Sequence, residues 1–340
     1  MLLSEKQEFG STILPYATIM KTFIKKFKIF NFIFEVFISI SENIFLKIST
    51  ISKLLLNLKI IRRLAFNLQP RNKHILLSTN YGMYVINTNS RIIGKKSYIN
   101  NIPYSANSVK KVFETLTKEN IFFDYFIDIG ANIGTSSISA SFINEKIKFL
   151  CIEGSYENFY LLKKNVIINN LESRFELHNS LIGNKDNLRI FVEFKEEKGC
   201  SSIFENHEEL ERYKREFGYE VDSIKEVKTQ KIEDILKIDF NKKLFFWIDI
   251  EGLDLEILNS EITKNKHPVF FEFNPTFYKL KLINYQNYLE KLEIKLMEYG
   301  YEYYFLEANK FKKEKIMKGF LTHTSALLGE NKSATNILLI

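Results

Sequence analysis

Apolar and polar positions follow two alternating patterns over the last two thirds of the chain. Short apolar runs predict seven strands, at Phe123–Ile129, Lys148–Glu153, Arg174–Ile182, Leu244–Ile250, Val269–Phe273, Tyr301–Leu306 and Thr335–Ile340. Stretches with helical periodicity lie between several of them, near Thr135–Ile143, Glu157–Asn169, Leu253–Asn259 and Tyr285–Tyr299. Strands that alternate with helices are typical of a parallel sheet covered on both faces. The pattern therefore predicts a doubly wound α/β fold.

One stretch, Leu188–Lys231, breaks this alternation. It holds a strand-like run at Arg189–Phe194, a polar helix-like segment at Asn206–Phe217 and a second strand-like run near Ile224–Gln230. We interpret it as an insertion before the fourth strand, close to the carboxyl ends of the strands, where ligands bind in folds of this kind.

The first seventy residues are basic and amphipathic. Polar residues recur every three or four positions through Lys21–Leu68, which predicts two helices that Pro70 ends. Residues 1–73 carry twelve Lys and Arg against four Asp and Glu, whereas the whole chain has a net charge of only +7. Two hypotheses fit these helices: packing on the main domain or on a partner chain, and peripheral contact of residues 21–68 with an anionic membrane.

A small β region is expected next. The apolar runs Ile75–Leu77, Tyr84–Ile86 and Arg91–Ile93 are separated by turn residues and predict an antiparallel meander. A short helix at Ser105–Thr117 follows. The predicted regions are therefore helices over residues 1–72, the meander and lead-in helix over 73–118, and the α/β domain over 119–340.

Composition limits the location and the metal chemistry. No apolar stretch reaches the roughly 18 residues that span a bilayer, and the start of the chain lacks the basic segment of a secretory signal. The two cysteines, Cys151 and Cys200, form no metal-ligand or disulfide spacing. We therefore expect a cytoplasmic protein without a metal site, with membrane association as the open alternative.

The strongest motif begins in the first strand of the α/β domain. Asp128 closes a buried apolar run, a glycine-rich turn from Gly130 through Asn132 to Gly134 follows, and a helix starts at Thr135. Glycines let a ligand approach the backbone, and a helix N-terminus offers free N–H groups to an acidic group. The G-x-x-x-G spacing differs from the G-x-G-x-x-G fingerprint of dinucleotide-binding proteins. It therefore disfavours a nicotinamide-dependent oxidoreductase.

Carboxylates stand at the ends of three more strands. Glu153 ends the second strand 19 residues past Gly134, where an acid can accept hydrogen bonds from ribose hydroxyls. Asp249 and Glu251 follow the fourth strand, and Glu272 lies in the fifth. Because parallel strands end at one edge of the sheet, these acids are expected to lie near one another. Carboxylates so placed can act as general bases.

These motifs resemble those of the FkbM family of S-adenosylmethionine-dependent methyltransferases. The resemblance spans about residues 120–275, with the motifs in order. Its segments are Asp128–Thr135, Glu157–Asn170, the turn Gly199–Ser202, the late motif Ile248–Leu258 and Glu272–Pro275.

The resemblance implies a Rossmann-like sheet of seven strands with the last one antiparallel. It also implies S-adenosylmethionine as cofactor and methyl transfer to a hydroxyl oxygen of a sugar, glycan or natural product. The expected cofactor-binding residues are Asp128, Gly130, Asn132, Gly134, Thr135, Glu153, Ser155 and Asn179. The expected catalytic residues are Asp249, Glu251 and Glu272, and the expected substrate-binding residues are Ser201, Ser202 and Asn274.

Two positions depart from the family pattern. Gly154 stands where the family usually has proline, and Trp247 where it usually has lysine. The missing lysine supports the alternative of a non-catalytic module that docks through its N-terminal helices. His178 is a further, weaker candidate for the base. Nucleic acid is not an expected partner, because the α/β domain is close to neutral; the oligomeric state is left open.

Overall fold

The computed structural model describes residues 59–71, 73–183, 188–195, 201–236, 241–282, 284–307, 310–315, 319–330 and 334–340. These residues fall into two compact units, one that ends at Tyr104 and one that comprises Ser105–Ile340. The greater part of the two predicted amphipathic helices, residues 21–58, lies outside the described residues. None of the helices in the described part of the chain is long and apolar enough to cross a membrane.

The described part of the first unit, residues 59–71 and 73–104, holds two helices and one hairpin. Their bounds are α5 (Lys59–Asn67), β1 (His74–Thr79), β2 (Gly82–Asn87) and α6 (Ile93–Asn100). β1 and β2 pair in the antiparallel sense, as predicted. The prediction of a third strand at Arg91–Ile93 is wrong. The Gly94 N–H donates to the Ser90 hydroxyl at 2.9 Å and the Lys95 N–H to the Ser90 carbonyl at 2.9 Å, so local hydrogen bonds start a helix there instead.

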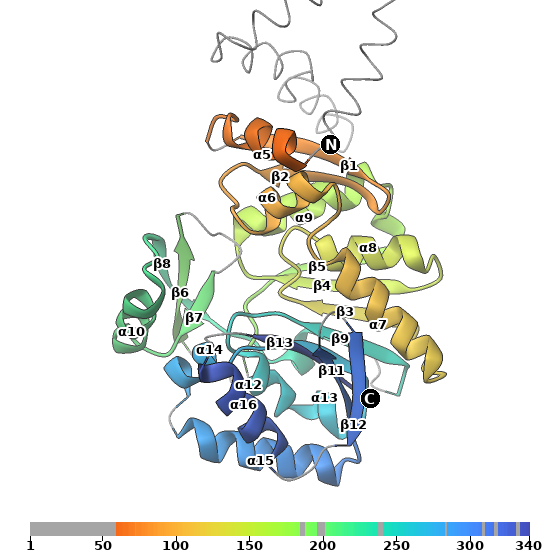
Figure 1. Ribbon diagram of the computed structural model, residues 1–340, viewed down its shortest axis with the longest axis vertical. Helices are drawn as coiled ribbons and strands as arrows, with labels where there is room; N and C mark the ends of the chain where they lie inside the picture. Colours follow the sequence, from red (N-terminus) through yellow and green to blue (C-terminus); the bar gives the residue numbers. More distant parts are fainter. Residues whose placement is uncertain are drawn as a thin grey trace, which may run out of the picture. The chain divides into compact units, whose positions relative to one another are not determined.

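The second unit is built on an eight-stranded sheet (Figure 1). The strands are β3 (Tyr125–Ile129), β4 (Lys148–Glu153), β5 (Phe175–Asn179), β9 (Leu244–Ile248), β10 (Val269–Phe273), β11 (Glu302–Glu307), β12 (Lys310–Lys315) and β13 (Thr335–Leu339). All seven predicted strands are present. The eighth, β12, was not predicted; it extends β11 as an antiparallel hairpin at the edge of the sheet.

The strand order is β12-β11-β13-β10-β9-β3-β4-β5. β5, β4, β3, β9 and β10 run parallel to one another. β13 lies antiparallel between β10 and β11, which confirms the antiparallel last strand. The order therefore reverses at β3, which lies between β4 and β9. In such sheets the carboxyl ends beside this reversal are where ligands bind.

Helices cover both faces of this sheet (Figure 1). On one side lie α7 (Ala106–Lys118), α8 (Thr135–Ile143) and α9 (Tyr156–Ile168); on the other lie α12 (Asp254–Leu258), α13 (Glu261–Lys264), α15 (Tyr285–Glu298) and α16 (Phe320–Glu330). Alternate residues of β3 serve the two faces. Phe126 stacks on Phe113 of α7, whereas Ile127 belongs to the apolar cluster that includes Leu289 of α15. Burial on both faces explains why this strand is almost wholly apolar.

The predicted insertion is present as a separate three-stranded sheet, in the order β7-β6-β8. Its elements are β6 (Leu188–Phe194), β7 (Ser202–Phe204), α10 (His207–Phe217) and β8 (Val221–Lys228). Phe191 and Ile203 of this sheet form a small apolar cluster with Leu253, beside the turn after β9. Three short elements complete the unit: 3-10 helix η1 (Glu172–Arg174), α11 (Ile232–Ile235) and α14 (Pro275–Lys281).

Candidate active site

The glycine-rich turn that joins β3 to α8 has a backbone conformation that favours glycine. Gly130 and Gly134 both have φ near +87°, and Asn132 has φ 51°. A Cβ at Gly130 would overlap the carbonyl oxygen of Asp249, and one at Gly134 would lie 2.7 Å from Leu162 Cδ1. The positive φ favours glycine at both places, and at Gly130 the Asp249 carbonyl of the turn after β9 also excludes a side chain.

Asp128 is buried beneath this turn. Its Oδ2 accepts hydrogen bonds from the hydroxyls of Ser136, at 2.5 Å, and Ser137. Its Oδ1 is buried and has no hydrogen-bond partner among the described residues. Burial raises the pKa of Asp128 to about 6, against the opposing effect of the two hydroxyls. The carboxylate thus holds the first turn of α8, which positions the helix N-terminus.

Glu153 ends β4 and faces the same turn. Its Oε2 accepts the backbone N–H of Asn132 at 2.8 Å, and its Oε1 accepts that of Ser155 at 2.7 Å. Burial raises its pKa to about 7. Each carboxylate oxygen has a second lone pair, so Glu153 can accept further hydrogen bonds from a ligand while these two fix its orientation.

The other residues of the predicted cofactor set lie around Glu153. Ser155 caps α9, and its hydroxyl donates to Glu193 Oε1 of the insertion at 2.6 Å. Asn179 closes β5, where its amide donates to the carbonyls of Glu153 at 2.8 Å and Gly154 at 3.2 Å. Thr135, the first residue of α8, lies 3.2 Å from the Ser105 hydroxyl. The structure thus gathers these residues at the ends of β3, β4 and β5.

The turn after β9 carries the densest group of acids. Asp249 is exposed to solvent. Desolvation by the protein around it, followed by repulsion from Glu272, Glu251, Asp254 and Asp128, raises its pKa well above the ordinary value. Its backbone N–H donates to the Ile129 carbonyl at 2.9 Å, so the turns after β3 and β9 are tied together. Asp249, Glu251 and Glu272 therefore lie near one another, whereas Glu153 lies with the glycine-rich turn.

Asp254, which the sequence did not single out as a site residue, holds this turn in shape. Its two oxygens accept the N–H groups of Ile250 at 3.2 Å and Gly252 at 3.1 Å. Burial raises the pKa of Asp254 to about 6. Glu251 has φ 51° and Gly252 φ 97°, so two consecutive residues adopt the left-handed conformation that the Asp254 bonds support.

A buried lysine behind this turn is the main feature that sequence reasoning missed. Lys281 of α14 is 8% exposed. Its Nζ donates to the Glu251 carbonyl at 2.7 Å, to the Ile203 carbonyl at 3.0 Å and to the Ser202 hydroxyl. Burial lowers its pKa to about 8. No sequence signal marks Lys281, because it lies among ordinary lysines at the end of a short helix.

The remaining predicted residues have mixed placements. Ser202 is buried and donates to the Glu251 carbonyl at 3.0 Å, whereas Ser201 is half-buried and Gly199 and Cys200 lie outside the described residues. Glu272 is half-buried in β10. Asn274 caps α14 by accepting the N–H of Thr276 at 3.2 Å.

His178 lies on β5, apart from the acids after β9. Its Nε2 is 2.8 Å from Glu176 on the same strand. It therefore has a local partner and is a poor candidate for the base.

Both departures from the family pattern have a physical basis. A Cβ at Gly154 would overlap the side chain of Leu181, so the space beside Gly154 is already filled. Trp247 is buried and stacks on Phe270 at 3.9 Å between ring centroids and on Phe126 at 6.0 Å. The Trp247 side chain thus belongs to the core. A buried cation that lies beside the turn of the late motif is Lys281, which donates to the Glu251 carbonyl.

The arrangement defines a class of protein. A doubly wound sheet has a glycine-rich turn after the central strand, an acid at the end of the next strand and a helix that begins directly after the turn. These features suit a nucleoside with an acidic tail: Glu153 can receive ribose hydroxyls, and the start of α8 a carboxylate. This is the Rossmann-like methyltransferase class. Within the described residues no cluster of His, Cys, Asp and Glu could hold a metal ion.

The family follows from a match to a known domain. A family model described as the methyltransferase FkbM domain matches residues 128–311, more than half of the chain. The chain belongs to the FkbM methyltransferase family, whose cofactor is S-adenosylmethionine.

Several solved structures are similar to the chain at low identity. A precorrin-6y C5,15-methyltransferase from Geobacter metallireducens is 12% identical with a TM-score of 0.34, covering 70% of this chain and 87% of that one. P. horikoshii TYW2 in complex with MeSAdo is 13% identical with a TM-score of 0.37, covering 80% and 72%. A SAM-dependent O-methyltransferase from Thermotoga maritima is 10% identical with a TM-score of 0.32, covering 68% and 63%. These likenesses say nothing about the acceptor. No curated protein matches the chain.

Proposed function

We propose that this protein transfers a methyl group from S-adenosylmethionine to a hydroxyl oxygen, on a sugar, glycan or natural-product acceptor. The observation that carries the proposal is the state of Asp249. It is exposed to solvent, and its pKa is raised by desolvation from the protein around it and then by the neighbouring Glu272 and Glu251. A carboxylate with a raised pKa is a stronger base in its ionised form, and a hydroxyl acceptor must lose its proton as the new bond forms.

The cofactor would be held at the end of β4, at the glycine-rich turn after β3 and at the start of α8. Glu153 would accept hydrogen bonds from the ribose hydroxyls, while the turn Gly130–Gly134 and the start of α8 would receive the acidic tail. Bound there, S-adenosylmethionine supplies a methyl group on a positively charged sulfur. Because the Asp249 carbonyl closely approaches Gly130, the proposed base and the proposed cofactor turn are directly adjacent. The main catalytic contribution would be alignment of the two reactants.

Each acid of the cluster has a separate proposed role. Asp249 takes the proton, Glu251 and Glu272 orient the acceptor by accepting hydrogen bonds from its other hydroxyls, and Ser201, Ser202 and Asn274 line the acceptor side. Carboxylates accept hydrogen bonds from neutral polyols and repel anions. The proposed acceptor is therefore neutral and rich in hydroxyls, and it is not a phosphate or a carboxylate.

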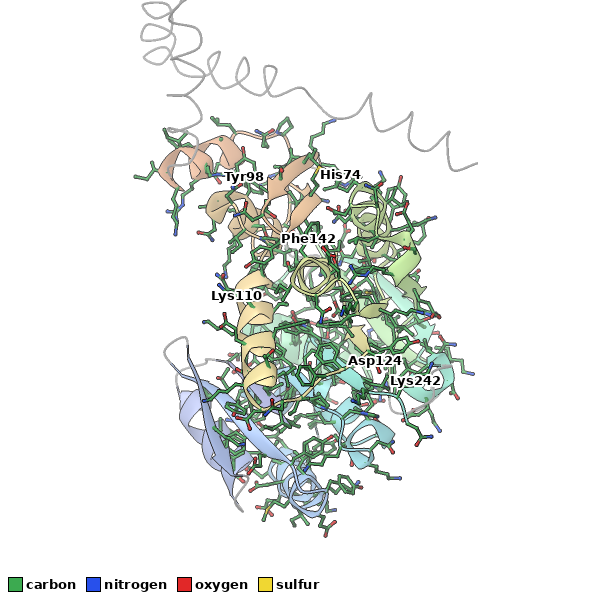
Figure 2. All side chains as sticks on the ribbon, turned by 90° about the vertical axis from the view of Figure 1, so that its right-hand side faces the viewer. His74, Tyr98, Lys110, Asp124, Phe142 and Lys242 are labelled. Atoms are coloured by element: carbon green, nitrogen blue, oxygen red, sulfur yellow. The ribbon has the colours of Figure 1, made fainter. Side chains whose placement is uncertain are left out.

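Labelled methyl transfer to a panel of glycans, glycosides and phenolic natural products, with amines included, tests this proposal. We expect the wild type to transfer the methyl group to a hydroxyl. Asp249→Asn should lose this transfer and should bind S-adenosylhomocysteine as the wild type does. The matched control is Asp124→Asn, an exposed acid at the amino end of β3 beside Lys242 (Figure 2). Transfer to amines alone would refute the hydroxyl acceptor, and full activity of Asp249→Asn would refute the base.

The sequence also suggested a non-catalytic module, on the ground that Trp247 replaces a lysine. Since Trp247 packs in the core against Phe270, its side chain gives no reason to infer a lost catalytic group. Methyl transfer is therefore preferred.

We also propose a cytoplasmic location, in keeping with the buried, unpaired Cys151. Membrane contact by residues 21–68 stays a prediction, because most of them, residues 21–58, lie outside the described residues.

A further inference from the structure

The first unit has an extreme charge composition. Residues 59–104 contain eight Lys and Arg and no Asp or Glu. Six of these cations are exposed: Lys59, Arg63, Arg71, Lys73, Arg91 and Lys96. Because residues 59–104 contain no acid that would neutralise these cations within the segment, the segment attracts anionic surfaces over distances of about a Debye length, roughly 8 Å at physiological salt.

One side of α5 is fixed to the rest of this unit. Phe66 is buried and lies 5.6 Å from the ring of Tyr98 in α6. Arg62 donates to the Tyr98 carbonyl at 3.2 Å and to Asn101 Oδ1 at 2.9 Å. Tyr98 is labelled in Figure 2. These contacts set the rotation of α5 about its axis, so the opposite side of the helix must face outward.

The outward side combines cations with large apolar side chains. Lys59 and Arg63 are exposed and one helical turn apart, and so are Ile60, at 75% exposure, and Leu64, at 43%. We call these four residues the α5 face. Two neighbouring exposed apolar side chains flanked by cations suit the boundary between lipid headgroups and acyl chains.

We propose that the α5 face docks this protein on an anionic lipid surface. Basic residues at the headgroup level attract the lipid phosphates, and Ile60 and Leu64 enter the boundary with the acyl chains. A nucleic acid would satisfy Lys59 and Arg63 but would offer no apolar partner to Ile60 and Leu64. The combination on one short helix therefore favours lipid. The inference does not depend on methyl transfer.

Vesicle flotation with the full-length protein tests this inference. The wild type should bind vesicles that contain phosphatidylserine and dissociate from them at high salt. It should not bind vesicles of pure phosphatidylcholine. Lys59→Gln/Arg63→Gln should weaken binding about 25-fold, because each basic residue near an anionic surface contributes roughly a fivefold factor. Ile60→Ser/Leu64→Ser should weaken it by a similar factor.

Matched controls lie in the second unit. Ile294 and Met297 of α15 are exposed to a similar extent, at 46% and 41%, and Lys110 and Lys118 of α7 are exposed cations. Ile294→Ser/Met297→Ser and Lys110→Gln/Lys118→Gln should bind vesicles as the wild type does. Circular dichroism would confirm that all variants are folded. Wild-type binding by both α5-face variants would overturn the proposal. So would equal binding to both lipids, or tight binding of an oligonucleotide with none to phosphatidylserine vesicles.

Discussion

Replacing Lys281 by methionine would remove a positive charge that the fold buries. The ammonium group has three hydrogen bonds, all to neutral acceptors: the carbonyls of Glu251 and Ile203 and the hydroxyl of Ser202. None of the described carboxylates forms an ion pair with it. The charge is therefore stabilised by dipoles and by acids at longer range, chiefly Glu209. This incomplete compensation makes the stability of the protein depend on pH in a way that can be measured.

The size and sign follow from the pKa of Lys281. Burial lowers it from 10.5 to about 8, which corresponds to about 3 kcal/mol. Below pH 8 the lysine is protonated in both states, and the full cost of burying the charge is present. Between pH 8 and 10.5 the unfolded chain keeps a proton that the folded protein has lost, so the free energy of unfolding rises with pH. Above 10.5 the cost is gone.

Urea unfolding at several pH values from 7 to 10 measures how the free energy of unfolding depends on pH. The measurement compares the wild type with Lys281→Met. We expect the wild type to gain up to about 2–3 kcal/mol relative to the variant over this range. Subtracting the two curves removes the contribution of tyrosines such as Tyr285, whose pKa is raised to about 12. Lys279→Met, which changes an exposed lysine on the same helix, should keep the wild-type slope. An identical slope in Lys281→Met would refute the buried charge.

Three further predictions concern the glycine-rich turn, the aromatic core and the pH dependence of the reaction. Gly130→Ala should abolish S-adenosylmethionine binding, because its Cβ would overlap the Asp249 carbonyl. As a control, Gly218→Ala changes a glycine that also has a positive φ but has open space around it. It should lower the free energy of unfolding by only about 1 kcal/mol. Trp247→Lys should lower the free energy of unfolding by about 4 kcal/mol or more, measured by urea titration, since it puts a charge in an aromatic core. In the wild type the rate of methyl transfer should increase with pH as Asp249, whose pKa is raised, loses its proton; a rate that falls with pH would contradict its role as base.

The sequence predicts the sheet well because its strands are buried on both faces. Runs such as Phe126–Ile129 and Phe245–Ile248 are apolar almost without interruption, which only a covered parallel strand requires. β12 has no such signal, because its sequence Lys310–Lys315 is mostly charged and it lies at the sheet edge. The third run of the predicted meander, Arg91–Ile93, is too short for periodicity to separate strand from helix.

The sequence places acids at strand ends, but it does not give the direction of their side chains. Asp128 turns beneath the helix to Ser136 and Ser137, which depends on where α8 starts. Lys281 was not predicted because its partners Ser202 and Glu251 are 79 and 30 residues away along the chain. Contacts of such separation depend on the packing of the insertion against the sheet, and no local pattern records them.

The central claim is that the turns after β3 and β4 form an S-adenosylmethionine site. Calorimetric titration of the full-length protein with S-adenosylmethionine and S-adenosylhomocysteine tests it most directly, with Asp128→Ala and Glu153→Ala beside the wild type. We predict binding by the wild type in the micromolar range, and its loss in both variants, since Glu153 holds the turn and receives the ribose and Asp128 holds α8. No binding by a well-folded wild type, or undiminished binding by Glu153→Ala, would contradict the account.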